Sequence, residues 1–388
     1  MKTEPKKDNR VILTFAGHFL PGYKGGGPIK TIKNLLDRVG QDISFKLITS
    51  DRDLGDTAAY TSVRGGTWST VGHAQVFYAP PGIISYMKVA KIIFDRKYDI
   101  VYINSFFSSR FSFFPLLIAR LLRQRIILAP RGEFSQGALS MKARKKQLFI
   151  RLYRFLRLHR CIVFQASSNY EAEDIRRVFG LSMNIIIAED IGSQDFAEIL
   201  PHRMGNRLRA VFISRISPMK NLLTALEILQ DVHEPVLYHI YGPIEDRSYW
   251  ARCEVLIKSL PPHIKVEYKG ELTPDQVVPT LSAYDLFFMP TKGENYGHVI
   301  AEALCAGLPI LITDKTPWRK LHEQGIGWDL PLSDLRAFSA VIDELALLPT
   351  FEHLKMRESV LAWAKNKFSQ RDVIDANITM FRNAYDKL

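Results

Sequence analysis

The chain has 388 residues, of which 47% are hydrophobic and 24% charged, and this size and composition predict two globular domains of about 200 residues or fewer. No apolar run reaches the ~20 residues of a membrane-spanning helix, and the polar start of the sequence does not resemble a signal peptide. The formal net charge of +12 favours an anionic partner, but the cations are not interleaved with aromatic residues as in a stacking platform, so we expect no nucleic acid partner.

The first expected element is a buried strand over residues 11–15, which leads into a turn with three consecutive glycines. Apolar residues at helical spacing follow from Ile29. A glycine-rich turn between a strand and a helix lets the backbone approach a phosphate, so Gly26 and Gly27 are candidate phosphate-binding residues. A plain turn is the alternative, because neither the GxGxxG nor the GK[ST] pattern is complete. His18, in the same loop, is either a functional residue or a surface histidine.

A second buried strand is followed by Asp51-Arg52-Asp53, a DxD pattern of the kind that can hold a metal ion. Patterns of three residues are common by chance, so we interpret this segment as a solvated loop and predict no metal site. Short strands and turns are expected over residues 54–80, with a hairpin near Gly65.

Two further strands are expected over residues 100–103 and 125–129. Ser105 follows the first of them, and the second is followed by the segment PRGE, which contains Arg131. Both residues are candidate functional residues because they follow strand ends. Arg131 could contact an acceptor or a phosphate, and a salt bridge within the loop is the alternative.

Residues 141–160 are predicted to form a basic amphipathic helix. Leu148, Leu152, Phe155 and Leu156 share one helical stripe, and the segment carries eight lysines and arginines. A helix of this kind can lie on an anionic membrane surface. The alternative is a core helix with a solvated basic face.

The strand pattern restarts at residues 208–213, after a boundary segment near residues 191–207. The next loop carries Arg215 and Lys220, a cationic pair that can clamp a diphosphate, Arg215 as a bidentate fork and Lys220 as a point charge. Helix capping or a surface position is the alternative for Lys220. A later strand ends at Gly242, which would let a nucleotide base approach the backbone.

The segment from Phe287 to Trp318 organises the second domain as a strand, a polar loop, a helix and another strand. Open α/β sheets bind ligands at such loops. Glu294 precedes the helix and Glu302 lies in its first two turns, and the backbone N–H groups between them favour a phosphate. Because carboxylates accept hydrogen bonds from hydroxyls, a sugar nucleotide fits both features. A capping or surface role is the alternative for the two carboxylates.

The spacing of Glu, seven residues and Glu, followed by AGLP, resembles the EX7E signature of retaining glycosyltransferases of family 4, which have the GT-B fold. The segments PRGE and TPWRKLHEQGIGWDL resemble the bacterial polysaccharide-assembly branch of that family, and the resemblance covers nearly the whole chain. The family pattern GRxxxxK[NG] is present with Ser214 in place of its glycine. Many members carry a histidine near Ser105, and this chain has none there.

The resemblance implies an α/β architecture of two Rossmann-like domains facing a central cleft. It assigns residues 1–195 to an acceptor-binding domain and residues 196–365 to a nucleotide-sugar-binding domain. Residues 366–388 would form a helix that packs back on the first domain.

The resemblance also implies roles for individual residues. Arg215, Lys220 and the helix N-terminus would stabilise the leaving diphosphate, Glu294 would orient the donor sugar, and Glu302 would bind the ribose hydroxyls. The predicted catalytic residues are therefore Arg215, Lys220 and Glu294. The predicted donor-binding residues are Gly26, Gly27, Gly242, Asn295, Tyr296, Gly297, His298, Val299 and Glu302. The predicted acceptor-side residues are His18, Ser105 and Arg131.

The implied function is retaining, metal-independent transfer of a hexosyl group from a nucleotide diphosphate sugar, with UDP-sugar expected first and GDP-sugar second. The acceptor would be a saccharide or lipid-linked hydroxyl in exopolysaccharide, capsule or lipopolysaccharide assembly, and no other cofactor is expected. The alternatives are an epimerase or phosphorylase of the same fold, or a non-catalytic basic binding protein. Three scattered cysteines suit a reducing compartment, so the expected location is the cytoplasm, with docking at the inner face of the membrane as an addition.

Overall fold

The computed structural model describes residues 8–140, 143–203 and 205–386, and the chain forms two compact units. Unit 1 contains the described residues up to Ile191 together with those from Arg371 onward, and unit 2 is Gly192–Gln370. The sequence-based divisions lie after residues 195 and 365. The assignment of acceptor and donor to the two domains stays a prediction.

Unit 1 is built on an eight-stranded sheet in the order β3-β4-β2-β1-β5-β6-β7-β8. Every neighbouring pair is parallel except the β3–β4 hairpin. The strands are β1 (Asp8–Ala16), β2 (Ile43–Ser50), β3 (Trp68–Val71), β4 (Ala74–Ala79), β5 (Ile100–Asn104), β6 (Arg125–Ala129), β7 (Val163–Ala166) and β8 (Ile185–Ile187).

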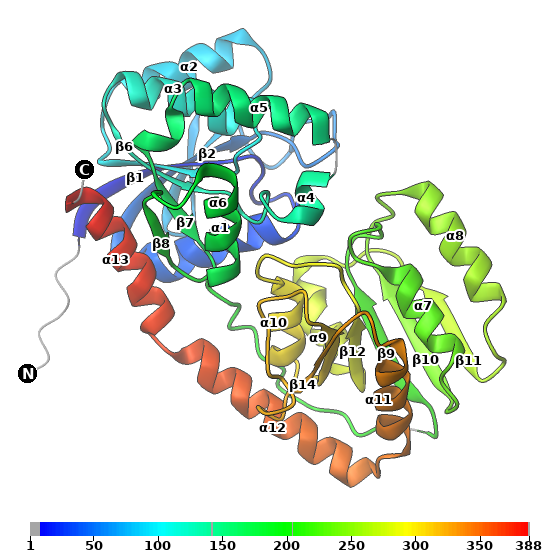
Figure 1. The fold of residues 1–388 in the computed structure, drawn as a ribbon. Helices are drawn as coiled ribbons and strands as arrows, with labels where there is room; N and C mark the ends of the chain where they lie inside the picture. The colour runs from blue at the N-terminus through cyan, green and yellow to red at the C-terminus, as the bar shows by residue number, and fades with distance from the viewer. Residues whose placement is uncertain (1–7, 141–142, 204, 387–388) are drawn as a thin grey trace, which may run out of the picture. The chain divides into compact units, whose positions relative to one another are not determined.

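Helices cover both faces of this sheet (Figure 1). Helices α1 and α13 pack on one face, and α2, α3, α5 and α6 pack on the other. Because helices cover both faces, the central strand β5 is buried along its whole length, and it is apolar except at its last residue, Asn104. The helices are α1 (Gly27–Val39), α2 (Ile83–Phe94), α3 (Phe114–Leu121), α4 (Gln136–Ser140), α5 (Ala143–Phe155), α6 (Asn169–Phe179) and α13 (Asp372–Asp386).

The hairpin expected near Gly65 lies elsewhere. Its turn is at Gly72-His73, because Val71 pairs directly with Ala74 and Gly72 adopts a φ of +54°. A positive φ favours glycine, and Gly72 meets this requirement inside the pairing register.

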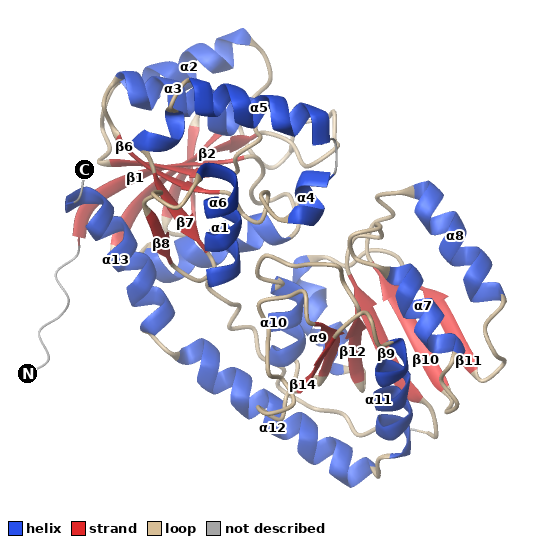
Figure 2. Cartoon of the chain, in the orientation of Figure 1, coloured by secondary structure: helices blue, strands red, loops and turns tan. Residues whose placement is uncertain are grey.

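Unit 2 has a six-stranded parallel sheet in the order β11-β10-β9-β12-β13-β14. Figure 2 shows that the strands of each unit gather into a sheet with helices around it. The strands are β9 (Leu208–Ile213), β10 (Val236–Tyr241), β11 (Ile264–Tyr268), β12 (Leu286–Met289), β13 (Ile310–Thr313) and β14 (Gly327–Leu330). The helices are α7 (Leu222–Gln230), α8 (Arg247–Lys258), α9 (Val277–Ser282), α10 (His298–Cys305), α11 (Leu335–Leu347) and α12 (Thr350–Ser369).

The expected terminal helix is divided in two near the predicted break. Helix α12 ends at Ser369, Gln370 is extended with a ψ of 137°, and α13 follows. Within unit 1, the Phe381 ring of α13 contacts Phe45 of β2 and Tyr102 of β5, at centroid distances of 5.6 and 5.3 Å.

Some predicted segments extend beyond the described residues. The first two residues of the basic helix predicted over 141–160 lie outside them, and so do the last two residues of the terminal helix. In the part of the chain that the structure describes, no helix is both long and apolar enough to cross a membrane.

Candidate active site

Two loops of unit 2 leave the sheet at the point where its strand order reverses. In chain order the six strands read 3-2-1-4-5-6, so β9 and β12 are neighbours whose connections run to opposite sides. Ligands of open α/β sheets bind outside the carboxyl ends of the strands at such a reversal. The loop after β9 spans residues 214–221, and the loop after β12 spans residues 290–297.

Hydrogen bonds join the two loops. The Lys292 N–H donates to the Met219 carbonyl at 2.9 Å, and the Thr291 hydroxyl donates to the same oxygen at 3.2 Å. The buried side-chain amide of Asn221 donates to the Pro290 carbonyl at 2.9 Å. These bonds hold the two loops in register with each other.

Lys220 and Glu294 meet across these two loops. The Lys220 Nζ donates to the Glu294 Oε1 at 2.5 Å, and the two side chains are 16% and 10% exposed. A half-buried cation beside a carboxylate can bind a phosphate on one side and hydroxyl groups on the other. Two of the three predicted catalytic residues are therefore brought together, although 74 positions separate them in the sequence.

Arg215 lies in the same loop as Lys220 but is more exposed to solvent. Its Nη1 donates to the Glu245 Oε1 at 3.0 Å, and the side chains are 42% and 44% exposed. Ion pairs at this exposure are weak, so a bound diphosphate can displace Glu245 at small cost. The sequence analysis did not identify Glu245, although it lies three residues after Gly242 in the loop that follows β10.

The N-terminus of α10 contributes backbone N–H groups to the same edge. Gly297 is its N-cap, with a φ of +83°, and among the described residues no side chain caps this end. The predicted donor-binding residues Asn295 and Tyr296 precede this cap, and His298 and Val299 begin the helix. An uncapped helix start with its positive dipole end favours an anion.

Trp318 holds the loop that leads into α10. Its indole Nε1 donates to the Tyr296 carbonyl at 2.5 Å, and the two rings lie 5.7 Å apart. The Tyr296 ring also contacts His298 at 4.8 Å. The sequence analysis named Trp318 only as the end of the segment that begins at Phe287. It did not predict that the Trp318 indole holds the Tyr296 carbonyl.

Glu302 lies one turn further along α10 and is 6% exposed. Burial, with a smaller contribution from the nearby Glu302, raises the pKa of the Cys305 thiol well above its usual range. The alternative of a surface role for Glu302 is wrong, because α10 is buried along most of its length between the sheet and α12.

Gly242 directly follows β10 and lies next to the loop after β9. It adopts a φ of +126°, and its N–H donates to the Gly270 carbonyl at 2.8 Å. A Cβ at this position would lie 2.1 Å from the Ser214 carbonyl oxygen. The glycine therefore permits a close backbone approach at the start of the loop that carries Arg215.

Unit 1 has a corresponding reversal between β1 and β5, and two predicted acceptor-side residues follow these strands. The His18 Nδ1 lies 3.2 Å from the Arg52 carbonyl oxygen, and the Ser105 hydroxyl donates to the Glu133 Oε1 at 3.0 Å. Gly26 is the N-cap of α1, with a φ of +63°, and Gly27 is its first residue. His18 and Ser105 thus lie at the edge of unit 1 where a ligand is expected.

Arg131 forms a salt bridge inside unit 1, but its partner Asp190 lies 59 positions away and not within the same loop. Its side chain is 7% exposed, pairs with Asp190, and donates to the Asn104 Oδ1 at 2.7 Å and to the Tyr102 hydroxyl at 2.5 Å. These contacts occupy much of its guanidinium inside unit 1. A direct contact of Arg131 with an acceptor stays a prediction.

The DxD segment is not the solvated loop that we expected. Asp51 and Asp53 are 4% and 5% exposed, and Asp51 pairs with Arg52 at 2.9 Å. The Asp53 Oδ2 accepts the N–H groups of Tyr23 and Lys24 at 2.8 and 3.1 Å. Asp53 is buried because its carboxylate holds the loop after β1, a contact that the local pattern could not reveal.

The match to a family model coincides with this site. Residues 201–362 match the model of "Glycosyl transferases group 1", and this range includes both loops at the strand reversal in unit 2. No curated protein sequence matches the chain.

Solved structures resemble the chain over nearly its whole length. Anabaena HepE in complex with UDP and glucose is 16% identical over 97% of this chain and 99% of that chain, with a TM-score of 0.70. Sucrose-phosphate synthase from Thermosynechococcus elongatus is 14% identical over 98% and 100%, with a TM-score of 0.74. WaaG, a glycosyltransferase involved in lipopolysaccharide biosynthesis, is 14% identical over 95% and 99%, with a TM-score of 0.66.

The fold is GT-B. This confirms the predicted architecture of two Rossmann-like α/β domains. Together with the group 1 match, the GT-B fold supports a glycosyltransferase, whereas the low identities say nothing of its substrates.

Proposed function

We propose that this GT-B protein is a retaining glycosyltransferase that moves a sugar from a nucleotide diphosphate sugar to a hydroxyl group of a saccharide or lipid-linked acceptor. The observation that carries the proposal is the Lys220–Glu294 pair at the strand reversal of unit 2, beside the uncapped start of α10. Unit 2 would bind the donor, UDP-sugar first and GDP-sugar second, and unit 1 would bind the acceptor. HepE, one of the similar structures, contains UDP and glucose, which supports a UDP-sugar.

The reaction would develop negative charge on the leaving diphosphate as its bond to the anomeric carbon breaks. Lys220, Arg215 and the N–H groups at the start of α10 would stabilise that charge, which is usually the largest contribution to such catalysis. Glu294 would accept hydrogen bonds from the donor sugar, and Glu302 from the ribose.

Retention of configuration would follow from attack on the same face that the diphosphate leaves. The acceptor oxygen would bond to the anomeric carbon, and its proton would pass to the leaving phosphate. Arg215 and Lys220 would supply the positive charge that a metal ion provides in other enzymes. We therefore expect turnover to persist in the presence of a metal chelator. The free cysteines Cys161, Cys253 and Cys305 suit a reducing compartment, so we expect the enzyme to act in the cytoplasm.

Nucleotide binding provides the first test. UDP, GDP and ADP would be compared by thermal shift, since a ligand at ~100 times its Kd adds about 2.7 kcal/mol of stability. The matching nucleotide sugar would then be assayed for release of the nucleotide and for the anomeric configuration of the product. Lys220→Ala should slow release by about 10²–10³-fold, by analogy with loss of an oxyanion donor.

Lys355→Ala is the matched control, because Lys355 is exposed on α12 of unit 2. It should retain the wild-type rate. Unchanged turnover in Lys220→Ala, or no stabilisation by any of the three nucleotides, would contradict the proposal. Turnover that requires inorganic phosphate would instead identify a phosphorylase.

A further inference from the structure

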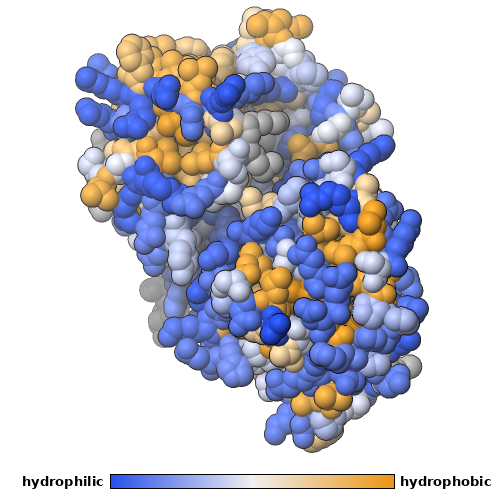
Figure 3. Space-filling view, turned by 45° about the vertical axis from the view of Figure 1, so that its right-hand side comes forward, coloured by the Kyte–Doolittle hydropathy of each residue, from blue (hydrophilic) through white to orange (hydrophobic). Residues whose placement is uncertain are grey.

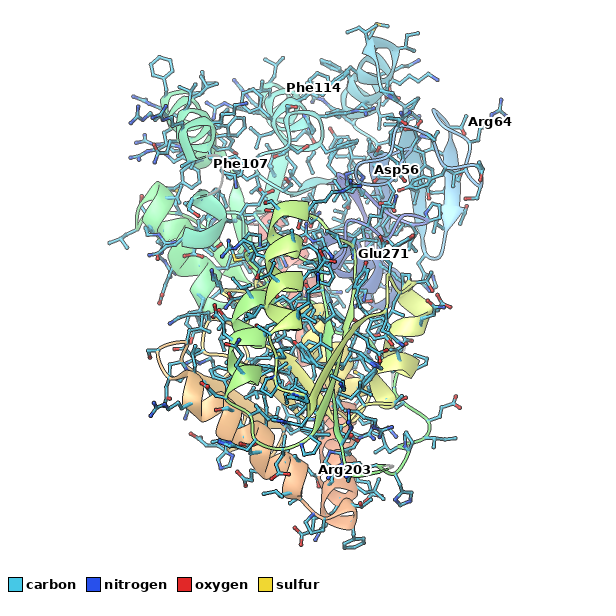
Figure 4. The ribbon with its side chains drawn as sticks, turned by 90° about the vertical axis from the view of Figure 1, so that its right-hand side faces the viewer. Asp56, Arg64, Phe107, Phe114, Arg203 and Glu271 are labelled. Atoms are coloured by element: carbon cyan, nitrogen blue, oxygen red, sulfur yellow. The ribbon has the colours of Figure 1, made fainter. Side chains whose placement is uncertain are left out.

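Three helices lie in a row on one face of unit 1. Helix α3 lies in the middle, because the Phe114 ring contacts Tyr86 of α2 at 5.1 Å, and Phe113, just before α3, contacts Phe149 of α5 at 5.4 Å. Figure 1 shows α2, α3 and α5 on the side of the sheet away from α13, and Figure 3 shows apolar areas among strongly hydrophilic ones on this unit. Figure 4 labels Phe114 on the middle helix.

Helix α5 is apolar on two opposite sides. Tyr153 is buried against the sheet, and Ile150 packs beside it. Leu148, Leu152 and Phe155 form a stripe on the other side and are 68%, 45% and 82% exposed. The alternative in which this stripe faces the core is therefore wrong, and α5 presents an apolar stripe to solvent.

The other two helices extend this surface. Among the described residues, 21 large apolar side chains are exposed, and ten of them belong to α2, α3, α5 and the residue after α5. The clustering marks an interaction surface, since single exposed apolar residues are usually scattered. The ten residues, which we call the docking face, are Ile83, Ile84, Met87, Phe94, Leu117, Leu121, Leu148, Leu152, Phe155 and Leu156.

The charges on the same helices all have one sign. The sequences of α2, α3 and α5 contain eight lysines and arginines and no aspartate or glutamate. Helix α12 of unit 2, which also exposes a large apolar residue, mixes Glu352 and Glu358 with lysines. The cations are Lys88, Lys91, Arg120, Arg144, Lys145, Lys146, Arg151 and Arg154.

We propose that the docking face binds the surface of an anionic lipid bilayer. Apolar side chains of a surface helix enter the boundary between headgroups and acyl chains, while long basic side chains reach the anionic headgroups. Cations such as Arg144, Arg151 and Lys145 lie within one turn of Leu148 and Leu152 on the exposed side of α5, which suits this geometry. An acidic protein would satisfy the charge, but a bilayer also accepts the outward stripes of three neighbouring helices without a matching shape.

Vesicle co-sedimentation of the full chain tests the proposal without any substrate, so its result is independent of the proposed function. The wild type should bind vesicles of phosphatidylcholine with about 30% phosphatidylglycerol, bind pure phosphatidylcholine at least about tenfold more weakly, and dissociate at about 0.5 M salt. Leu148→Ser with Phe155→Ser, and separately Arg151→Gln with Arg154→Gln, should each weaken binding to the anionic vesicles about tenfold or more.

Matched controls come from unit 2. Val255→Ser with Phe351→Ser changes side chains that are 70% and 76% exposed, and Lys355→Gln with Lys365→Gln removes two exposed charges. Both control pairs should bind vesicles as the wild type does, and circular dichroism would verify that every variant is folded. Absence of wild-type binding, equal binding to neutral vesicles, or equal loss in the controls would overturn the proposal. The proposal would also be overturned if Leu148→Ser with Phe155→Ser changed only the oligomer mass measured by light scattering and left vesicle binding unchanged.

Discussion

Lys220 and Glu294 stabilise each other in a site with little access to solvent. Their charged groups lie 2.5 Å apart, and removing one partner would leave the other half-buried and uncompensated. A ligand that contacts both groups would offer Lys220 a second anion and Glu294 new hydrogen-bond donors. In the proposed function, a diphosphate would provide the anion for Lys220, and sugar hydroxyls would provide the donors for Glu294. A nucleotide sugar carries both groups, whereas a free nucleotide carries only the first.

Glu294→Gln should therefore distinguish binding of the diphosphate part of the donor from binding of its sugar. The substitution keeps the shape of the side chain but removes its charge, so UDP should bind at least as tightly as to the wild type. The UDP-sugar that the enzyme uses should bind about tenfold more weakly, or ~1.4 kcal/mol, because a carboxylate accepts stronger hydrogen bonds than an amide. Isothermal titration of both ligands measures this difference.

Lys220→Met is the companion variant, and it should weaken UDP and UDP-sugar alike. If Glu294→Gln lowered the affinity for the two ligands by the same factor, Glu294 would not contact the sugar. The proposed assignment of Glu294 would then be wrong, even if Lys220 still bound the diphosphate.

At the scale of the elements, the site depends on how closely the ends of neighbouring strands approach. Strands β9 and β10 pair in parallel up to Ile213 and Tyr241, and the chain then turns at Gly242. A side chain at this position would collide with the Ser214 carbonyl and would also be strained at a φ of +126°. The loop that carries Arg215 can therefore keep its position only because a glycine, Gly242, follows the neighbouring strand β10.

Gly242→Ala should destabilise unit 2 by about 1–3 kcal/mol through backbone strain and the collision with Ser214. It should also weaken UDP binding, since the loop after β9 must shift. Gly325→Ala is a matched control: Gly325 has a φ of +68°, but an added Cβ meets no atom within 4 Å. Thermal unfolding and UDP titration of both variants are the measurements. Equal loss of UDP binding in the two variants would argue against a specific effect at Gly242.

At the scale of the whole molecule, each unit has its own hydrophobic core, and the chain passes from unit 1 to unit 2 and back. Arg357 of α12 joins several segments of unit 2. Its guanidinium is buried and donates to the carbonyls of Gly307, Pro201 and Ser282 at 3.2, 3.0 and 2.7 Å. Burial lowers the pKa of Arg357 to about 10, so it remains a cation at neutral pH.

Arg357→Leu should destabilise unit 2 by about 3 kcal/mol or more, because each buried carbonyl left without a donor costs about 1–3 kcal/mol. Amide hydrogen exchange should then accelerate on the order of 100-fold in β9 and β13, while β1 and β5 keep their protection. Arg336→Leu, at an exposed position of α11, is the control and should change neither unit. Equal acceleration in unit 1 would show that the two units do not unfold separately.

The resemblance to a known family implied the GT-B fold. The amino-acid sequence by itself determined the alternation of strands and helices and the loops that carry Arg215, Lys220 and Glu294. These features follow from local patterns, namely apolar periodicity, glycine turns and charges at strand ends. The strand restart at residues 208–213 and the break near residue 370 are confirmed for the same reason.

Only the tertiary structure decided which residues meet. Lys220 pairs with a carboxylate 74 positions away, and Asp53 is buried because it binds backbone N–H groups about 30 positions earlier. The stripe on α5 could face either the core or solvent, since helical periodicity groups residues on one side without saying what covers that side. Partners and burial depend on contacts between distant parts of the chain, and those contacts form only when the sheets and helices pack together.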